Sequence, residues 1–193
     1  ITMKNILIDN SIKLLPKEEM LEIKQNFKSL SVGIPKESSL QEKRVAITPE
    51  SVELLVNSGH KVYVEKDAGI FSNFYNEEYI KYGAVITDKR DEIYSCDFVL
   101  KIEPPTVSEI NFLSEKNVII SALQLNIHKK SFFDSINKKN ITAVSFEYLQ
   151  DDEGKNSIVR SMSEIAGNTS VLIASECLSN INDGKGILLG GIS

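Results

Sequence analysis

The sequence predicts an α/β fold in which helices cover both faces of a parallel sheet. Short apolar runs of strand length alternate along the chain with helical patterns, as in proteins built from strand–helix–strand units. Several of these runs are continuously apolar, which is typical of strands that are buried on both faces. The 193 residues are 41% hydrophobic and 25% charged, the composition of a chain that folds around a core.

The predicted elements follow one another from a short N-terminal helix onward. Pro16 lies early in the first turn of that helix, and acidic residues follow near its positive end. Thr48 and Pro49 are typical of the start of a second helix, which Gly59 ends. The predicted strands are residues 30–35, 60–65, 84–86, 96–102, 117–125 and 141–145. The predicted helices are residues 16–23, 49–58, 76–82, 129–137 and 158–179. This order indicates a Rossmann-like or flavodoxin-like sheet, with ligands at the carboxyl ends of its strands.

The pattern divides the chain into three parts. Residues 1–29 form an N-terminal helical extension, and residues 30–157 form the α/β domain. Residues 158–193 contain a long, mostly apolar helix whose length suits a connection between two domains. The glycines that follow it do not match GxGxxG, so we expect them to begin a further domain rather than to hold a phosphate.

Charge, hydropathy and cysteine spacing limit the partners and the location that we expect for this protein. With 22 Lys and Arg against 27 Asp and Glu, the net charge is -5, which argues against nucleic acid as a partner. No apolar run reaches the roughly 18 residues of a membrane span, so we expect no membrane insertion. Cys96 and Cys177 lie in apolar runs without metal-ligand spacing, which predicts two buried, reduced thiols, no metal site and a cytoplasmic location.

Three charged residues are candidates for chemistry near the strand ends. Arg44 follows a polar loop and opens an apolar run, so it would lie near a strand edge, where it could hold a carboxylate with two hydrogen bonds. A surface ion pair with Glu42 or Glu50 would also explain it. Lys101 and Glu103 are two residues apart, which places them on one face of a strand, either as an acid–base pair or as an ordinary exposed ion pair.

Two uncharged candidates come from the next strand and its loop. Gln124 ends an apolar strand, where its amide could orient a carbonyl group but could not exchange protons at neutral pH. His128 lies just beyond it and is the histidine best placed to titrate near a cleft, although solvated loop histidines are common.

Six motifs run through the chain in unbroken register. They are VGIPKE at 32–37, EKRVAITP at 42–49, SGHKV at 58–62, AG at 68–69, LK at 100–101 and MSEIAG at 162–167. As a set they resemble the N-terminal half of the alanine dehydrogenase and pyridine-nucleotide transhydrogenase family. The resemblance implies an oligomeric, two-domain enzyme whose substrate domain, here residues 30–157, is split around an NAD-binding Rossmann domain. NAD would then be bound mainly by that second domain, which this sequence does not contain.

The resemblance also implies roles for individual residues. Arg44 matches the arginine that binds the substrate carboxylate. Met162 and Ser163 match residues that contact the dinucleotide beside the nicotinamide, in a form closer to alanine dehydrogenases than to transhydrogenases. Glu103 and Gln124 depart from the family, because alanine dehydrogenases have a substrate-binding lysine and a catalytic histidine there. Lys101 and His128 are the nearest residues that could take over.

Three functions are therefore open. The first is an alanine dehydrogenase that converts L-alanine, water and NAD to pyruvate, ammonia and NADH, with these 193 residues alone expected to be inactive. The second is the NAD(H)-binding alpha component of a proton-translocating transhydrogenase, since such proteins also lack the lysine and the histidine. The third is a non-catalytic fragment.

Overall fold

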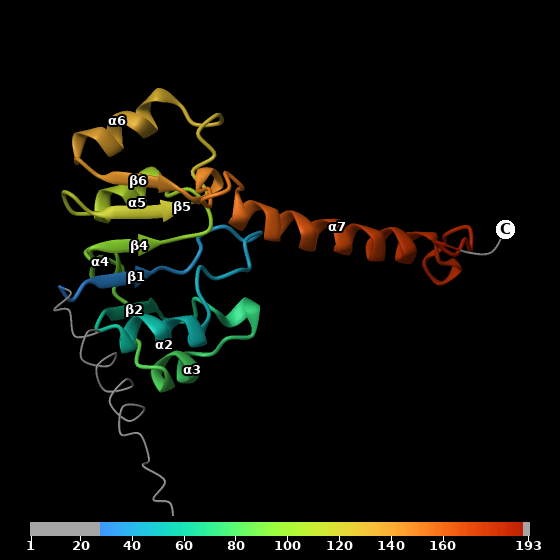
Figure 1. The fold of residues 1–193 in the computed structure, drawn as a ribbon, viewed down its shortest axis with the longest axis horizontal. Coiled ribbons are helices and arrows are strands. Elements are labelled where there is room, and N and C mark those ends of the chain that lie inside the picture. Colours follow the sequence, from blue (N-terminus) through green and yellow to red (C-terminus); the bar gives the residue numbers. More distant parts are fainter. Residues whose placement is uncertain (1–27, 191–193) are drawn as a thin grey trace, which may run out of the picture.

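Six parallel strands form a single sheet in the structure, a computed structural model that describes residues 28–190 (Figure 1). The strand order is β3-β2-β1-β4-β5-β6, and every neighbouring pair is parallel. The strands are β1 (Ser31–Ile34), β2 (Lys61–Glu65), β3 (Val85–Thr87), β4 (Phe98–Leu100), β5 (Val118–Ser121) and β6 (Thr142–Ser145). All six predicted strands are therefore present. The predicted helix at 16–23 lies outside the described residues.

Helices connect the strands and cover both faces of the sheet. They are α2 (Pro49–Asn57), α3 (Asn76–Lys81), α4 (Arg90–Tyr94), α5 (Val107–Phe112), α6 (Lys130–Lys138) and α7 (Ser157–Leu178), with short 3-10 turns η2 (Ile70–Ser72), η3 (Phe146–Tyr148) and η4 (Asn180–Asn182). The predicted cap of α2 is confirmed, because the Thr48 side chain accepts a hydrogen bond from the Ser51 backbone N–H. Helices α4 and α5 were not predicted, because their five and six residues make fewer than two turns and so show no repeat of the helical period.

Two apolar clusters form the core, one on each face of the sheet. Ile93 of α4 and Ile110 of α5 pack on one face together with Val99 of β4. Val52 of α2 and Tyr79 of α3 pack on the other face, against Val32, Ile34, Val62 and Val64 of β1 and β2. The fold is thus the doubly wound α/β arrangement that the continuous apolar runs predict.

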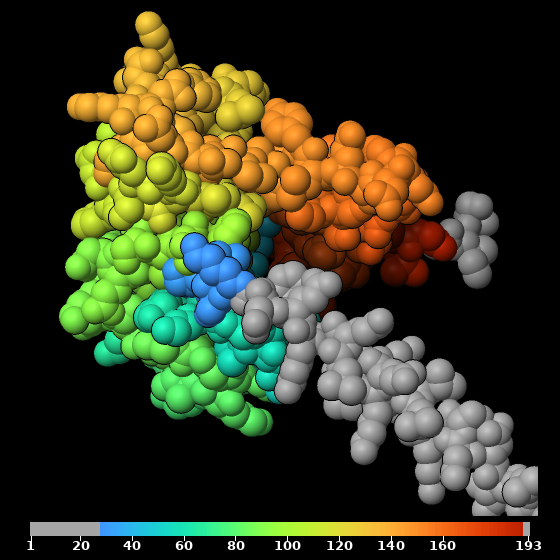
Figure 2. All heavy atoms as spheres, turned by 60° about the vertical axis from the view of Figure 1, so that its left-hand side comes forward, coloured from blue at the N-terminus to red at the C-terminus, as the bar shows by residue number. Residues whose placement is uncertain are grey.

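The carboxyl edge of this sheet is the expected place for a ligand. The chain winds outward from β1 to β2 and β3 and then returns to place β4 on the other side of β1, so the order reverses between β1 and β4. In open α/β sheets, ligands bind outside the strand ends at such a reversal. The described chain begins at the opposite, amino edge, where its first residues, drawn blue, lie between the segments of β2 and β4 (Figure 2).

Helix α7 leaves from the carboxyl edge and projects away from the sheet (Figure 1). None of its 22 residues is buried among the described residues. Cys96 is buried as predicted, but the prediction for Cys177 was wrong: this thiol is exposed, because the described residues cover no part of α7 well enough to bury a side chain. Within residues 28–190, no helix has both the length and the apolar character needed to span a bilayer.

Candidate active site

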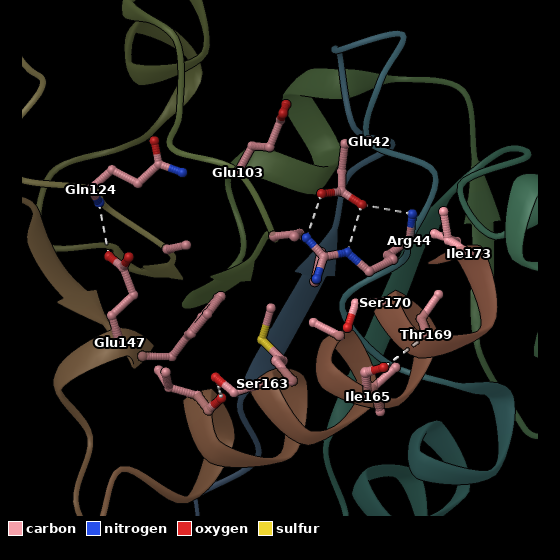
Figure 3. Close-up of a pocket in the computed structure, with 16 residues that line it drawn as sticks. Glu42, Arg44, Glu103, Gln124, Glu147, Ser163, Ile165, Thr169, Ser170 and Ile173 are labelled. Atoms are coloured by element: carbon pink, nitrogen blue, oxygen red, sulfur yellow. Dashed lines mark hydrogen bonds and ion pairs between the residues drawn. The ribbon is translucent and has the colours of Figure 1, made fainter. Parts of the chain in front are cut away.

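A cleft of about 830 Å³ lies at the carboxyl edge of the sheet, between the strand ends and α7 (Figure 3). Four of the six strands, β1, β4, β5 and β6, each contribute a polar residue from the segment that follows the strand. Arg44 comes from the loop after β1, Glu103 follows β4, Gln124 follows β5 and Glu147 follows β6. The wall that α7 supplies is mostly apolar and includes Val159, Met162, Ile165 and Ala166.

Arg44 lines this cleft and is also held by Glu42. Its Nε donates to Glu42 Oε1 at 2.8 Å, and its Nη2 donates to Glu42 Oε2 at 2.6 Å. The Arg44 backbone N–H donates to the same Oε1 at 2.9 Å. These hydrogen bonds lower the pKa of Glu42 and raise that of Arg44, so both groups are charged at neutral pH. The ion pair with Glu42 and the position beside a cleft, which the sequence left as alternatives, therefore coexist.

One edge of the Arg44 guanidinium remains available. Glu42 takes Nε and one hydrogen of Nη2, and within residues 28–190 no group accepts a hydrogen bond from Nη1. The Arg44 side chain is 54% exposed, whereas that of Glu42 is 10% exposed. Since a guanidinium has five donors in a fixed plane, the free edge can still bind a carboxylate with two parallel hydrogen bonds.

Gln124 faces the cleft from a strained backbone position. Its φ is 45°, in the left-handed region that residues with a Cβ rarely adopt. Its backbone N–H donates to Glu147 Oε2 at 2.9 Å, and the Ser145 hydroxyl donates to the same oxygen at 3.0 Å. Glu147 therefore fixes the turn that presents Gln124. Glu147 was not among the predicted site residues, although an acid two residues after a predicted strand was a possible signal.

The predicted pairing of Lys101 with Glu103 was wrong. Strand β4 ends at Leu100, so the two-residue repeat does not extend to these side chains. Lys101 is buried, with its Nζ 3.2 Å from Glu37 Oε2 and 3.2 Å from Glu109 Oε1. Glu103 instead is half-buried and lines the cleft. Lys101 is thus neither a cleft residue nor part of an exposed ion pair.

His128 lies in a neighbouring hollow of about 460 Å³, whose wall also includes Glu103 and Gln124. Its ring stacks on Phe132 with 3.9 Å between the ring centres, and its Nε2 is buried without a hydrogen-bond partner in the described chain. The structure therefore brings Arg44, Glu103 and Gln124 together and places His128 beyond them.

Met162 and Ser163 lie on the α7 wall of the cleft. Ser163 donates its hydroxyl to the Val159 carbonyl at 2.8 Å, a bond within the helix, and the Met162 side chain is partly exposed to the cleft. An apolar wall of this kind suits the face of a flat ring. The loop after β1 contains no glycine between residues 36 and 48, so the described sheet offers no glycine-rich phosphate loop at that strand.

Comparison with known proteins gives a consistent result. Residues 33–166 match the family model described as alanine dehydrogenase/PNT, N-terminal domain. Alanine dehydrogenase from Staphylococcus epidermidis is 36% identical over 163 residues, which are 84% of this chain and 44% of that protein. Alanine dehydrogenase from Methanococcus maripaludis is 36% identical over 162 residues, 83% of this chain and 43% of that protein. The chain thus spans less than half the length of these curated relatives.

Solved structures agree with the sequence relatives. An L-alanine dehydrogenase superimposes with a TM-score of 0.78 at 29% identity, over 84% of this chain and 45% of that chain. A transhydrogenase from Sinorhizobium meliloti gives a TM-score of 0.58 at 29% identity, over 62% of this chain and 35% of that chain. The motifs, the sheet order and both kinds of comparison lead to one conclusion: the chain belongs to the alanine dehydrogenase/PNT family and carries its N-terminal domain.

Proposed function

We propose that this chain is the acid-binding part of an NAD-dependent alanine dehydrogenase, which interconverts L-alanine, water and NAD with pyruvate, ammonia and NADH. The observation that carries the proposal is the free edge of Arg44 in the cleft at the carboxyl edge of the sheet. A small keto acid has a planar carboxylate, which can accept two parallel hydrogen bonds from the free edge of the Arg44 guanidinium. In this proposal residues 30–157 are the substrate domain, and residues 158–193 lead into a dinucleotide-binding domain.

The other cleft residues then act on the remainder of the substrate. The Gln124 side-chain amide can donate a hydrogen bond to the keto oxygen, and the hydrogen bond from its backbone N–H to Glu147 holds Gln124 at the cleft. Glu103 and Glu147 supply negative charge near the carbon that gains or loses ammonia, and Glu103 is a group that can exchange protons. Bound NAD would accept or return the hydride, with Met162 and Ser163 beside its nicotinamide ring. Oligomer formation and a cytoplasmic location belong to the same proposal.

A second candidate is the NAD(H)-binding component of a transhydrogenase. The residues at 103 and 124 favour it, because a glutamate and a glutamine replace the lysine and the histidine that alanine dehydrogenases carry. In that case hydride would pass between two nicotinamides, and no amino acid would be consumed. The two functions therefore differ in whether NADH oxidation depends on pyruvate and ammonium.

The test is NADH oxidation by the full-length protein that carries this chain, with pyruvate and ammonium as substrates. Arg44→Met should abolish measurable turnover, and Arg44→Lys should raise KM for pyruvate about 10- to 100-fold, because a lysine keeps the charge but loses the two-pronged contact. Arg160→Met is a matched control, since Arg160 is an exposed arginine on α7 that pairs with Glu164 and does not line the cleft.

Two results would refute the alanine dehydrogenase proposal. One is a wild-type protein that oxidises no NADH with pyruvate and ammonium and reduces no NAD with L-alanine. The other is turnover that survives in Arg44→Met. Pyruvate-independent hydride exchange between NADH and an oxidised nicotinamide analogue would instead support the transhydrogenase component.

A further inference from the structure

The loop that carries Arg44 is anchored at its base by three consecutive residues. The Lys36 backbone N–H donates to Glu65 Oε2 at 2.8 Å. Glu37 Oε1 accepts from the backbone N–H of Ile102 at 2.6 Å. The Ser38 hydroxyl donates to Glu109 Oε1 at 2.7 Å. The loop base is therefore tied to β2, to the segment after β4 and to α5.

Lys101 joins two of these anchors. Its ammonium lies 3.2 Å from the carboxylate of Glu37, on the loop, and 3.2 Å from that of Glu109, on α5. The side chains of all three residues are at most 4% exposed. Two buried carboxylates so close together would repel each other strongly without the cation between them. Arg90 also approaches Glu109, with its Nη2 3.9 Å from Oε1, but Lys101 is the cation that contacts both carboxylates and so bridges Glu37 and Glu109.

Glu109 cannot easily move toward another partner. Its second oxygen, Oε2, accepts hydrogen bonds from the Thr106 backbone N–H at 2.8 Å and from the Thr106 hydroxyl at 3.1 Å, which closes the capping box of α5. Helix α5 in turn packs into the core through Ile110. The fixed side of the cluster is thus α5, and the side that Lys101 holds in place is the loop.

Beyond Ser38 the loop has few other contacts before it reaches Arg44. Before Arg44, the Lys43 carbonyl accepts from the Ser72 hydroxyl at 2.8 Å. After Arg44, Val45, Ala46 and Ile47 pack against the core, and the Ile47 carbonyl accepts from the Tyr79 hydroxyl at 2.9 Å. Leu40 is 96% exposed, so the middle of the loop gains little from packing. The chain after Arg44 is thus held by its own packing, whereas the chain before Arg44 is held mainly by the anchors at the loop base.

We propose that Lys101 is a positioning residue for substrate binding: by bridging Glu37 and Glu109 it fixes the base of the loop that places Arg44 in the cleft. This inference rests on the proposed function in that Arg44 must bind an organic acid. It assigns Lys101 no contact with substrate and no proton transfer. A misplacement of a binding group by about 1 Å can cost a hundredfold in rate, so a loosened loop should be visible in substrate affinity.

The test compares pyruvate binding and loop mobility in Lys101→Met, in full-length protein with NADH present and ammonium absent, so that no amination occurs. Calorimetry should show pyruvate binding weakened at least about tenfold, with NADH binding unchanged. Hydrogen exchange should show faster exchange of amides in residues 36–48 than in wild type. Lys66→Met is the matched control, because Lys66 directly follows β2 as Lys101 follows β4, and its side chain is exposed. It should leave both readouts unchanged.

A gentler variant covers the case in which Lys101→Met does not fold. Ser38→Ala removes one loop anchor and keeps Lys101 and both carboxylates, and it should weaken pyruvate binding severalfold and speed exchange in the same segment. Wild-type pyruvate affinity in a folded Lys101→Met protein, or in Ser38→Ala when Lys101→Met is unfolded, would overturn the inference. If wild type binds pyruvate through Arg44 but turns nothing over, the proposed function fails and the positioning role stands. If wild type binds no pyruvate, both fail.

Discussion

Glu42 holds Arg44 by two side-chain hydrogen bonds of 2.8 Å and 2.6 Å and leaves the Nη1 edge of the guanidinium open to the cleft. The carboxylate of Glu42 is nearly buried, whereas the guanidinium is half exposed. A substrate that binds the open edge would therefore add to this pair rather than displace Glu42. The pair sets the plane in which Arg44 meets its ligand.

Glu42→Gln should raise KM for pyruvate about fivefold and leave kcat nearly unchanged, because one charge-assisted hydrogen bond that orients Arg44 is lost while the binding group remains. Steady-state kinetics of the full-length protein measure both constants. Glu50→Gln is the control, since Glu50 lies in the first turn of α2 and makes no ion pair with Arg44. A lower KM in Glu42→Gln would mean that Glu42 competes with the substrate instead of orienting Arg44.

Much of the fold could be predicted because its signals are local. The strands are continuous apolar runs, and α2 carries its start signal in Thr48 and Pro49. Arg44 could be found because it stands in a motif whose register extends over most of the chain. The strands, the start of α2 and the motif around Arg44 can all be recognised from residues close together in the sequence, without knowledge of contacts between distant segments.

The errors concern features that local patterns do not encode. Lys101 was misplaced because β4 ends at Leu100, two residues before the predicted end of the strand, and because its partners Glu37 and Glu109 come from distant segments. Glu147 was missed because it acts from a 3-10 turn of three residues, which has no periodicity. Cys177 was misjudged because an apolar helix need not be covered within the described chain.

The strained backbone of Gln124 predicts an unusual order of stability. The φ of Gln124 is 45°. The free energy of unfolding of Gln124→Gly should therefore exceed that of Gln124→Ala by about 1 kcal/mol, because alanine keeps the left-handed strain and glycine removes it. Both variants lose the side-chain amide and should lower turnover with pyruvate to a similar extent. Urea unfolding of the two variants gives the difference. The ordinary order, with glycine less stable than alanine, would show that the turn is not strained in solution.

Gly33 in the central strand should tolerate no side chain. A Cβ at this position would lie 2.1 Å from the backbone oxygen of Ile93, at the point where α4 crosses β1. Gly33→Ala should therefore lower the free energy of unfolding by about 3 kcal/mol or more, since the clash involves backbone atoms that cannot rotate away. Gly167→Ala is the control: its Cβ would meet no atom within 4 Å, and alanine favours a helix. Equal stabilities of the two variants in thermal unfolding would contradict the close packing of α4 on β1.

The buried cluster around Lys101 predicts how stability depends on pH. Burial alone would raise the pKa of Glu109, but the charge of Lys101 and hydrogen bonds from Thr106 and Ser38 outweigh it and lower the pKa to about 2. A carboxyl whose pKa is lower in the folded state stabilises the fold above its unfolded pKa of 4.5 and loses that contribution as the pH falls toward 2. Burial raises the pKa of Glu37, so this residue works in the opposite direction.

Comparison of wild type with Glu109→Gln isolates the contribution of Glu109 to the pH dependence of stability, because Glu37 is present in both proteins. The difference in free energy of unfolding between them should be largest above about pH 5, at roughly 3 kcal/mol, and should shrink steadily as the pH approaches 2. Urea titrations at a series of pH values measure it. A difference that stays constant across this range would mean that Glu109 is not held as a carboxylate by Lys101. The loop base would then lack the ionic bridge that we assign to it.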